Sequence, residues 1–204
     1  MIRKLLFLLV MFPVCCMAQS KYCVTWQDFL DGQWREPEGR VELVPSSKDD
    51  ALAMVVKAEK KKTAHILRRG ACVMEYEDSL YLNLRRFNTF GDVYVQAWRL
   101  GPDKLLFARQ DVAPTGFSVT FGGNVSPLSS KSFRTLSHLE NLVCYLAVWD
   151  PNREELRMAR VTEAVVQQLL TNHPDQLSHY QSLSRKQKES ADVIITLLHA
   201  AGII

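Results

Sequence analysis

The sequence predicts an α+β fold: an antiparallel β-sheet built from consecutive hairpins, with a short N-terminal helix and a C-terminal cluster of two or three helices. Three patterns predict it. Between residues 40 and 161, apolar runs of strand length alternate with tight turn signals. Strands that follow one another so closely pair antiparallel, because a parallel pair needs a long crossover connection. Residues 162–204 instead place apolar side chains at helical spacing, and a capping pattern near residue 25 predicts the short helix.

The first 18 residues have the pattern of a signal peptide. Arg3 and Lys4 precede an apolar run over residues 5–14, which is too short to cross a bilayer because a spanning helix takes roughly 20 apolar residues. The sequence CMA at residues 16–18 then resembles an ordinary cleavage site with small residues. We expect cleavage after Ala18, export to the periplasm or the extracellular space, and no transmembrane helix in the mature chain.

Two adjacent cysteines beside this site raise the alternative of a lipid anchor. A lipidated cysteine is normally preceded by a small residue, whereas Cys15 follows Val14 and Cys16 follows Cys15. Neither position fits, so we expect both cysteines to be removed with the signal peptide and no lipid to be attached.

The mature chain, residues 19–204, is expected to form a single α+β domain, strand-rich over 40–161 and helical over 162–204. It carries 23 basic and 22 acidic residues, a net charge near +1. A global basic field is therefore missing, and we expect no nucleic-acid partner. The length is ordinary for one domain.

The N-terminal third predicts two helices around one pair of strands. Thr25 and Asp28 form a capping pattern, and Gly32 suits the left-handed position that closes a helix. The runs RVELV and LAMVVKA predict strands with a loop from Pro45 to Asp50 between them. The stretch EKKKTAHILRRG then has good helix formers and ends at a glycine.

Three hairpins are predicted in the centre. The first turns at Glu77-Asp78, the second at residues 101–104, GPDK, and the third at Asp150-Pro151-Asn152. Residues 113–133, APTGFSVTFGGNVSPLSSKSF, separate the second hairpin from the third. We expect a long loop or an extended hairpin there; the alternative is a segment that contacts a partner or a membrane surface.

The tail predicts helices at 162–170 and 174–183 and a final helix that Ser184 and Gln187 cap. Pro174 suits the first position of the middle helix. The final helix has an apolar stripe and a stop at Gly202. The stripe consists of Ala191, Ile194, Ile195, Leu198 and Ala201. Such stripes are stable only when they pack on other elements.

Three cysteines remain after processing: Cys23, Cys72 and Cys144. Because three is odd, at least one thiol stays unpaired in a monomer. Cys72 and Cys144 both lie in apolar runs, which favours free thiols buried in a core. A Cys72–Cys144 bridge is the alternative, since an oxidising compartment allows it.

These patterns together resemble a family of exported Bacteroidetes-type proteins of unknown function. The resemblance rests on ACVMEYEDSLYLNLRRF, the TFGG segment, YLAVWDPNREELRMARV, and the tail from LLTNHPDQLSHY to VIITLLHAAGII. It runs through most of residues 55–204, although NVSPLSSKS departs from the family's pattern. The resemblance implies export and the same order of elements, and it implies no activity.

Motifs for catalysis, metals and cofactors are missing from the sequence. It contains no GxGxxG, GxxxxGK[ST], HExxH, EF-hand or GxSxG motif. None of the five histidines has a ligand spacing. Cys144 is a weak nucleophile candidate, because its apolar strand disfavours a thiolate. We therefore assign no catalytic, metal-binding or cofactor-binding residue.

The sharpest charge feature is KAEKKKTAHILRRG. It contains six basic residues against one glutamate: Lys57, Lys60, Lys61, Lys62, Arg68 and Arg69. These are candidates for contact with an anionic lipid or polysaccharide, and the alternative is an ordinary solvated helix face.

The sequence thus predicts an exported, periplasmic or envelope-associated protein that binds or scaffolds without catalysis. Its partner would be an envelope protein or an anionic lipid or polysaccharide. The alternative is a hydrolase whose site is assembled from residues scattered along the sequence.

Overall fold

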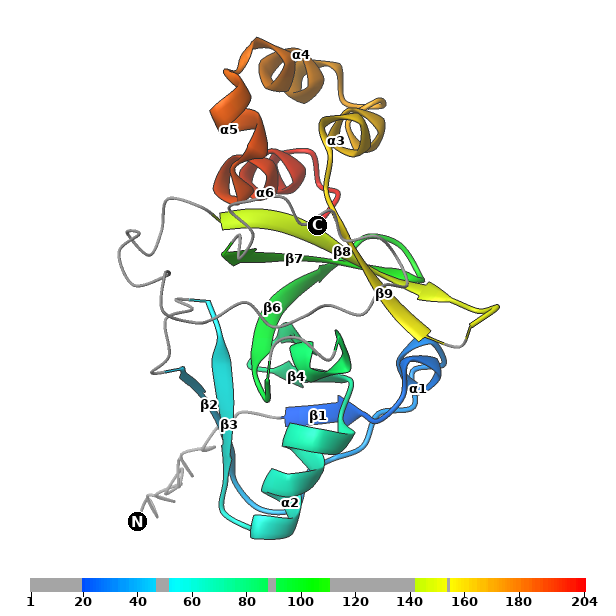
Figure 1. Cartoon of the computed structure of the whole chain (residues 1–204), viewed down its shortest axis with the longest axis vertical. Coiled ribbons are helices and arrows are strands. Elements are labelled where there is room, and N and C mark those ends of the chain that lie inside the picture. Colours follow the sequence, from blue (N-terminus) through cyan, green and yellow to red (C-terminus); the bar gives the residue numbers. More distant parts are fainter. Residues whose placement is uncertain (1–19, 47–51, 88–90, 111–141, 154) are drawn as a thin grey trace, which may run out of the picture.

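A computed structural model of the chain describes residues 20–46, 52–87, 91–110, 142–153 and 155–204 (Figure 1). It confirms the α+β class, with a large antiparallel sheet and helices that include a C-terminal group. The predicted signal peptide and the segment 113–133 lie outside the described residues.

The described strands form one antiparallel sheet in the order β1-β4-β5-β6-β7-β8-β9. The hairpin of β2 and β3 joins this path through one pair, Met54 with Tyr94. The strands are β1 (Ser20–Cys23), β2 (Val41–Pro45), β3 (Met54–Ala58), β4 (Val73–Tyr76), β5 (Ser79–Asn83), β6 (Tyr94–Arg99), β7 (Lys104–Gln110), β8 (Leu142–Asp150) and β9 (Glu155–Arg160).

Local turn chemistry places the three predicted hairpins. Glu77 and Asp78 both have positive φ, 48° and 59°, as the two-residue turn between β4 and β5 requires. Residues 100–103 connect β6 to β7, and the turn that begins at Pro151 connects β8 to β9. Each pair of strands is antiparallel, as predicted.

The helices begin at the predicted caps. Thr25 and Asp28 form a capping box that starts α1, and Pro174 occupies the first turn of α4. The helices are α1 (Trp26–Leu30), α2 (Lys61–His65), the π-helix η1 (Ile66–Gly70), the 3₁₀-helix η2 (Leu84–Phe87), α3 (Glu163–Leu169), α4 (Pro174–Ser182), α5 (Arg185–Glu189) and α6 (Ala191–Ala200).

The predicted final helix is in fact two helices, so the described tail has four. The Ser184–Gln187 capping box starts α5, which ends at Glu189. Ser190 is extended, with φ −73° and ψ 128°, and α6 begins after it. The break follows from burial, because α5 has no buried residue whereas α6 turns Ala191, the first residue of its apolar stripe, into the core.

The two faces of the sheet bury different clusters because side chains alternate along each strand. Along β7, Leu105 and Phe107 face one cluster while Leu106 and Ala108 face another. The inner cluster contains Cys23, Trp26, Phe29, Cys72, Val73, Leu82, Leu84, Val95, Ala97, Leu105, Phe107 and Ala147. The tail cluster contains Leu106, Ala108, Leu142, Cys144, Val161, Val166, Leu170, Tyr180, Ala191, Ile194, Leu197 and Leu198.

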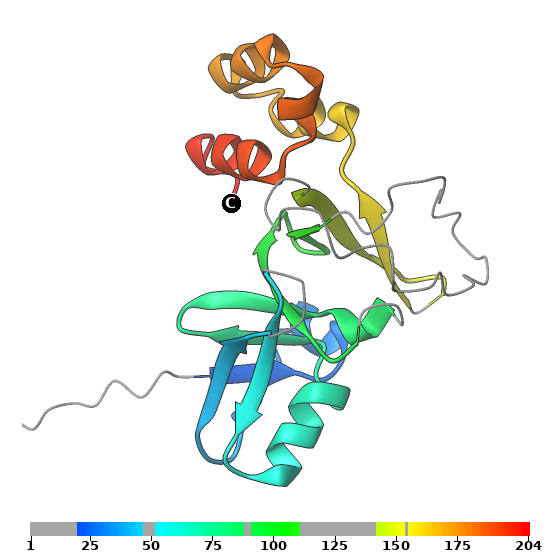
Figure 2. The same cartoon turned by 60° about the vertical axis from the view of Figure 1, so that its left-hand side comes forward.

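A third cluster, the hairpin cluster, packs β2, β3 and η1 against the opposite end of the sheet. It contains Tyr22, Val41, Leu43, Val56, Leu67, Ala71, Met74 and Tyr94. The tail helices and α2 therefore occupy opposite ends of the molecule in both views (Figures 1 and 2).

The sheet curls around the inner cluster. Cys23 near one edge and Met158 of β9 at the other edge both contact this cluster, which a flat sheet would not allow. Trp26 and Phe29 of α1 fill the open side, and η2 lies against β9. The curled sheet leaves its outer face for the other two clusters and for the candidate sites.

Candidate binding surfaces

The six basic candidate residues lie on three consecutive elements at the α2 end of the molecule. Lys57 belongs to β3, Lys60 precedes α2, Lys61 and Lys62 belong to α2, and Arg68 and Arg69 belong to η1. All six are exposed, but the structure divides them by what they contact.

Two of the six have structural contacts. Lys60 Nζ lies 3.1 Å from Glu38 Oε2. Arg68 donates to the backbone carbonyl of Val56 from Nε at 3.2 Å and from Nη2 at 2.9 Å. Their side chains are therefore held against the protein, and they are poor candidates for contact with a partner.

Lys57 lies in a groove of mixed charge. Its lining residues are Arg40, Glu42, Lys57, Ala58 and Glu59. Lys57 lies opposite Glu42 in the β2–β3 register. Glu42 Oε1 forms an ion pair with Arg40 Nη2 at 2.8 Å. The charges of this groove largely offset one another, so Lys57 adds little to an anion site.

The other three residues, Lys61, Lys62 and Arg69, are named the basic face here. Within the described part of the chain, none of their side chains makes a hydrogen bond or an ion pair. Thr63 and Leu67, four residues apart, point into the protein and leave Lys61 and Arg69 on the exposed side.

Glu38 is an acidic residue whose carboxyl interacts with the charge of Lys62 in the basic face. Its hydrogen bond with Lys60 and the charges of Lys60 and Lys62 hold the pKa of this carboxyl below its usual value. Glu38 is thus an ionised carboxylate already bound to Lys60. It offsets part of the positive charge at this end of the molecule but leaves Lys61 and Arg69 without an acidic partner among the described residues.

Buried polar contacts hold the helix that carries the basic face. Asn83 Nδ2 donates to the carbonyl oxygens of Leu67, Arg68 and Ala71, at 3.3, 3.2 and 2.9 Å. Tyr94 Oη also donates to the Leu67 carbonyl. These carbonyls lie at the C-terminal end of η1, where a helix leaves its acceptors without partners. The basic face therefore rests on a firmly mounted helix.

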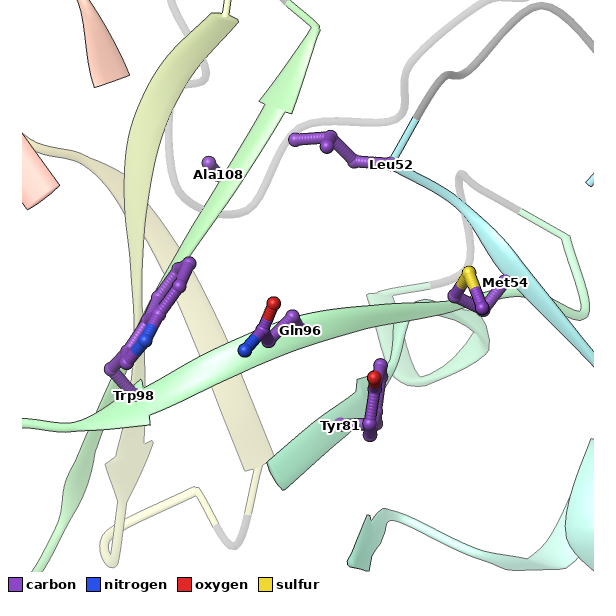
Figure 3. A pocket seen from close by; sticks show the side chains of 6 residues that line it. All are labelled: Leu52, Met54, Tyr81, Gln96, Trp98 and Ala108. Atoms are coloured by element: carbon purple, nitrogen blue, oxygen red, sulfur yellow. The ribbon is translucent and has the colours of Figure 1, made fainter. Parts of the chain in front are cut away.

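A second candidate site, the aromatic hollow, lies on the outer face of the sheet between the hairpin cluster and the tail cluster. It encloses about 160 Å³. Its lining residues are Leu52, Met54, Tyr81, Gln96, Trp98 and Ala108 (Figure 3).

Sheet register brings together lining residues from four strands, β3, β5, β6 and β7, and β7 contributes Ala108. Tyr81 of β5 pairs directly with Gln96 of β6, and Trp98 follows Gln96 on the same face. The single β3–β6 pair, Met54 with Tyr94, brings the start of β3 beside them. The sequence analysis did not predict this site. The one signal in the sequence was the alternation of side chains along β6, which places Gln96 and Trp98 on one face but relates no other lining residue to them.

Three polar groups of the hollow have no hydrogen-bond partner among the described residues: the Tyr81 hydroxyl, the Gln96 amide and the Trp98 indole N–H. Burial, and secondarily the charge of Glu77, raises the pKa of the Tyr81 phenol, so it remains a protonated donor at neutral pH. The hollow therefore combines apolar walls with uncharged hydrogen-bonding groups.

The tail fixes one wall of this hollow. The Trp98 ring packs edge-on against His199 of α6, with ring centroids 6.2 Å apart and an interplanar angle of 87°. His199 Nδ1 in turn lies 3.0 Å from the backbone oxygen of Ile204. The indole is thus restrained on one side by the tail.

Comparison with known proteins gives a family. Residues 21–203 match DUF6563, a family of unknown function, and this match spans nearly the whole described chain. The chain belongs to the DUF6563 family. No curated protein and no solved structure matches it. The predicted resemblance to an uncharacterised family is confirmed.

The three described thiols of this DUF6563 member are free and buried. Cys72 lies in the inner cluster and Cys144 in the tail cluster on the opposite face of the sheet, so the alternative Cys72–Cys144 bridge does not form. Burial raises the pKa of Cys23 to about 11 and the pKa values of Cys72 and Cys144 to about 12. Such thiols are poor nucleophiles at neutral pH.

No group of three or more His, Cys, Asp or Glu side chains within the described residues is arranged to hold a metal ion. None of the helices described here combines the length and the apolar character that crossing a bilayer requires.

Proposed function

We propose that this DUF6563 member is an exported, envelope-associated protein of Bacteroidetes-type bacteria that binds or scaffolds without catalysis. It contacts an anionic lipid or polysaccharide through the basic face. One observation carries this proposal: Lys61, Lys62 and Arg69 are exposed cations without an ion pair among the described residues, on a helix held by buried hydrogen bonds.

The strength of such a contact follows from surface electrostatics. Each Lys or Arg near an anionic membrane surface contributes about 1 kcal/mol, and the contribution falls off within a Debye length. Because Asn83 and Tyr94 already hold the helix, binding orders side chains only and not the backbone. Three cations therefore support weak, salt-sensitive association.

Export is supported by the N-terminal pattern, and the state of the thiols is compatible with it. A signal peptide over residues 1–18 would deliver the chain to an oxidising compartment. Burial and raised pKa values protect Cys23, Cys72 and Cys144 from oxidation there, because thiolates are the species that oxidise.

Binding without catalysis is supported by the chemistry of both candidate surfaces. The basic face offers lysine and arginine, and the hollow offers tyrosine, glutamine and tryptophan among apolar residues. The described residues of these two surfaces include no histidine, cysteine or carboxylate, the side chains that most often act as general acid, general base or nucleophile. The alternative, a hydrolase with a scattered site, predicts turnover of chromogenic ester or glycoside substrates by the purified protein.

The proposal is tested by co-sedimentation of the mature protein with vesicles of anionic or zwitterionic phospholipid. A parallel arm replaces the vesicles with an immobilised acidic polysaccharide. We expect salt-sensitive binding in at least one anionic arm, and the arm that binds identifies the source of the anionic groups. Binding in neither arm at low salt would overturn the proposal.

A charge-matched pair of variants tests the basic face itself. The double variant Lys61→Glu/Lys62→Glu should weaken binding at least about tenfold, because two favourable charges become unfavourable. The control is Lys104→Glu/Lys186→Glu, which makes the same change in net charge at two exposed positions away from α2. Equal losses in the two variants would mean that net charge, and not this face, governs binding.

A further inference from the structure

The aromatic hollow has a recognisable chemical character. Figure 3 shows Gln96 between Trp98 on one side and Tyr81 and Met54 on the other, with Leu52 and Ala108 further along the same space. Two aromatic rings therefore flank one amide group. Small-molecule sites commonly have this composition, with mostly apolar walls and a few polar groups that fix orientation.

The polar groups of the hollow select an uncharged ligand. Tyr81 Oη and the Gln96 amide can each donate and accept, whereas Trp98 Nε1 can only donate. Among the described residues, no charged side chain lines the hollow. A charged ligand would lose hydration without gaining a counter-charge, so the fitting ligand is neutral and carries both donors and acceptors.

The size of the hollow restricts the ligand further. Drug-sized ligands occupy pockets of about 300–1,000 Å³, and this hollow encloses about 160 Å³. It therefore takes a single ring and leaves the rest of a larger molecule outside. The ring must place an apolar face on an aromatic side chain and hydroxyl groups on the amide.

We propose that the aromatic hollow binds one neutral pyranose ring of a glycan. Trp98 provides the flat surface for the C–H face of the sugar, and Gln96 and Tyr81 hydrogen-bond its hydroxyl groups. A plain aromatic or aliphatic ring fits less well, because it leaves these polar groups without partners. The edge-on contact with His199 restrains the indole on one side, which lowers the entropy cost of binding.

This inference does not depend on the basic face. The two sites lie on different elements, since the basic face belongs to α2 and η1 whereas Tyr81, Gln96 and Trp98 belong to β5 and β6. The variant Lys61→Glu/Lys62→Glu should therefore keep sugar binding. Failure of one proposal is distinguishable from failure of the other.

The experiment titrates the full mature chain with methyl glycosides of neutral hexoses and N-acetylhexosamines, and follows amide chemical shifts by NMR. We expect at least one glycoside to shift the Gln96 side-chain amide and Trp98 indole signals saturably, with a dissociation constant on the order of 1 mM for one ring. Glucuronate and indole serve as charged and aromatic probes.

Variants separate this site from non-specific binding. Gln96→Ala should weaken binding at least about tenfold, and Tyr81→Phe, which removes only the hydroxyl, about threefold or more. Gln96 is exposed, so its replacement leaves the fold intact. The control Gln168→Ala, at an exposed position of α3, should bind like the wild type.

Three results would each overturn the inference. The first is the lack of a saturable shift with any neutral glycoside up to about 50 mM, which lies far above the expected constant. The second is tighter binding of indole or glucuronate than of every neutral sugar. The third is unchanged sugar affinity in both Gln96→Ala and Tyr81→Phe.

Discussion

Asn83 and Tyr94 face each other across β5 and β6, and both donate to the carbonyl oxygen of Leu67. Both side chains are fully buried. The pair thus ties the end of η1 to the centre of the sheet. It provides donors for carbonyl oxygens that the end of a helix leaves without partners. It also connects η1, which carries part of the basic face, to β6, the strand that contains Gln96 and Trp98.

Replacing Asn83 by aspartate should destabilise the protein strongly. The change keeps the shape of the side chain. It replaces the Nδ2 amide group, which donates to three carbonyl oxygens, with an oxygen that can only accept. We expect a loss of more than about 3 kcal/mol in the free energy of unfolding, because the carboxylate oxygen in place of Nδ2 would face carbonyl oxygens, while the other oxygen keeps its hydrogen bond from the Arg85 N–H. Urea unfolding measures this. Asn152→Asp, in an exposed turn, should change the free energy by less than about 0.5 kcal/mol.

Packing of α6 should be essential for the fold. Leu198 is fully buried in the tail cluster, so Leu198→Ala should cost about 2–5 kcal/mol, and deletion of residues 189–204 should unfold or aggregate the protein. Thr196→Ala, on the exposed side of the same helix, should change stability by less than about 0.5 kcal/mol. A truncated protein that melts like the full chain would show that the tail is a separate appendage.

Stability should fall as the pH rises above 9. Buried Cys72 and Cys144 have pKa values of about 12 in the folded protein against an ordinary value of 9.0. Above pH 9 the unfolded chain releases these protons while the folded chain keeps them, so the stabilisation is complete below pH 9 and declines above it. Each thiol should account for about 1 kcal/mol of loss between pH 7 and pH 10.

Urea unfolding of the wild type and of Cys144→Ala at pH 7 and pH 10 checks this effect. The variant should lose less stability between the two pH values than the wild type, because one titrating thiol is gone. Thiol labelling gives a second readout, with three reactive thiols per mature chain after unfolding. The same pH-dependent loss in both proteins would contradict the thiol assignment.

Processing of the exported chain should occur between Ala18 and Gln19. The cleavage site follows from the small residues before Gln19, and Cys15 and Cys16 should leave with the signal peptide. Intact-mass measurement of the protein recovered from the envelope or the medium decides this. A mass that includes diacylglycerol on Cys15 or Cys16 would show a lipid-anchored protein instead.

Several elements follow directly from short stretches of sequence. The turn at Glu77-Asp78, the capping box of Thr25 and Asp28, and the start of α4 at Pro174 each depend on residues within one turn of chain. The sequence also identified the basic segment, because charge is a property of composition. It did not separate Lys61 from Lys60, since that difference depends on where Glu38 lies.

Other features depend on contacts between distant residues. Ser190 ends α5 because Ala191 is buried in the tail cluster, and the buried role of Asn83 depends on η1. The aromatic hollow needs the β5–β6 register to place Tyr81 beside Gln96. The periodicity of residues within one segment does not predict contacts between two segments.

By itself, the sequence determined the α+β class, the three hairpin turns, the basic segment and most of the order of strands and helices, although it missed β1 and the division of the final helix into α5 and α6. These features arise from local backbone preferences and from the period of apolar residues, which act within a few residues. Only the tertiary structure decided the curl of the sheet, the division of the basic residues and the position of the hollow. Those depend on the burial of the inner, tail and hairpin clusters together, and burial is set by how all the elements pack.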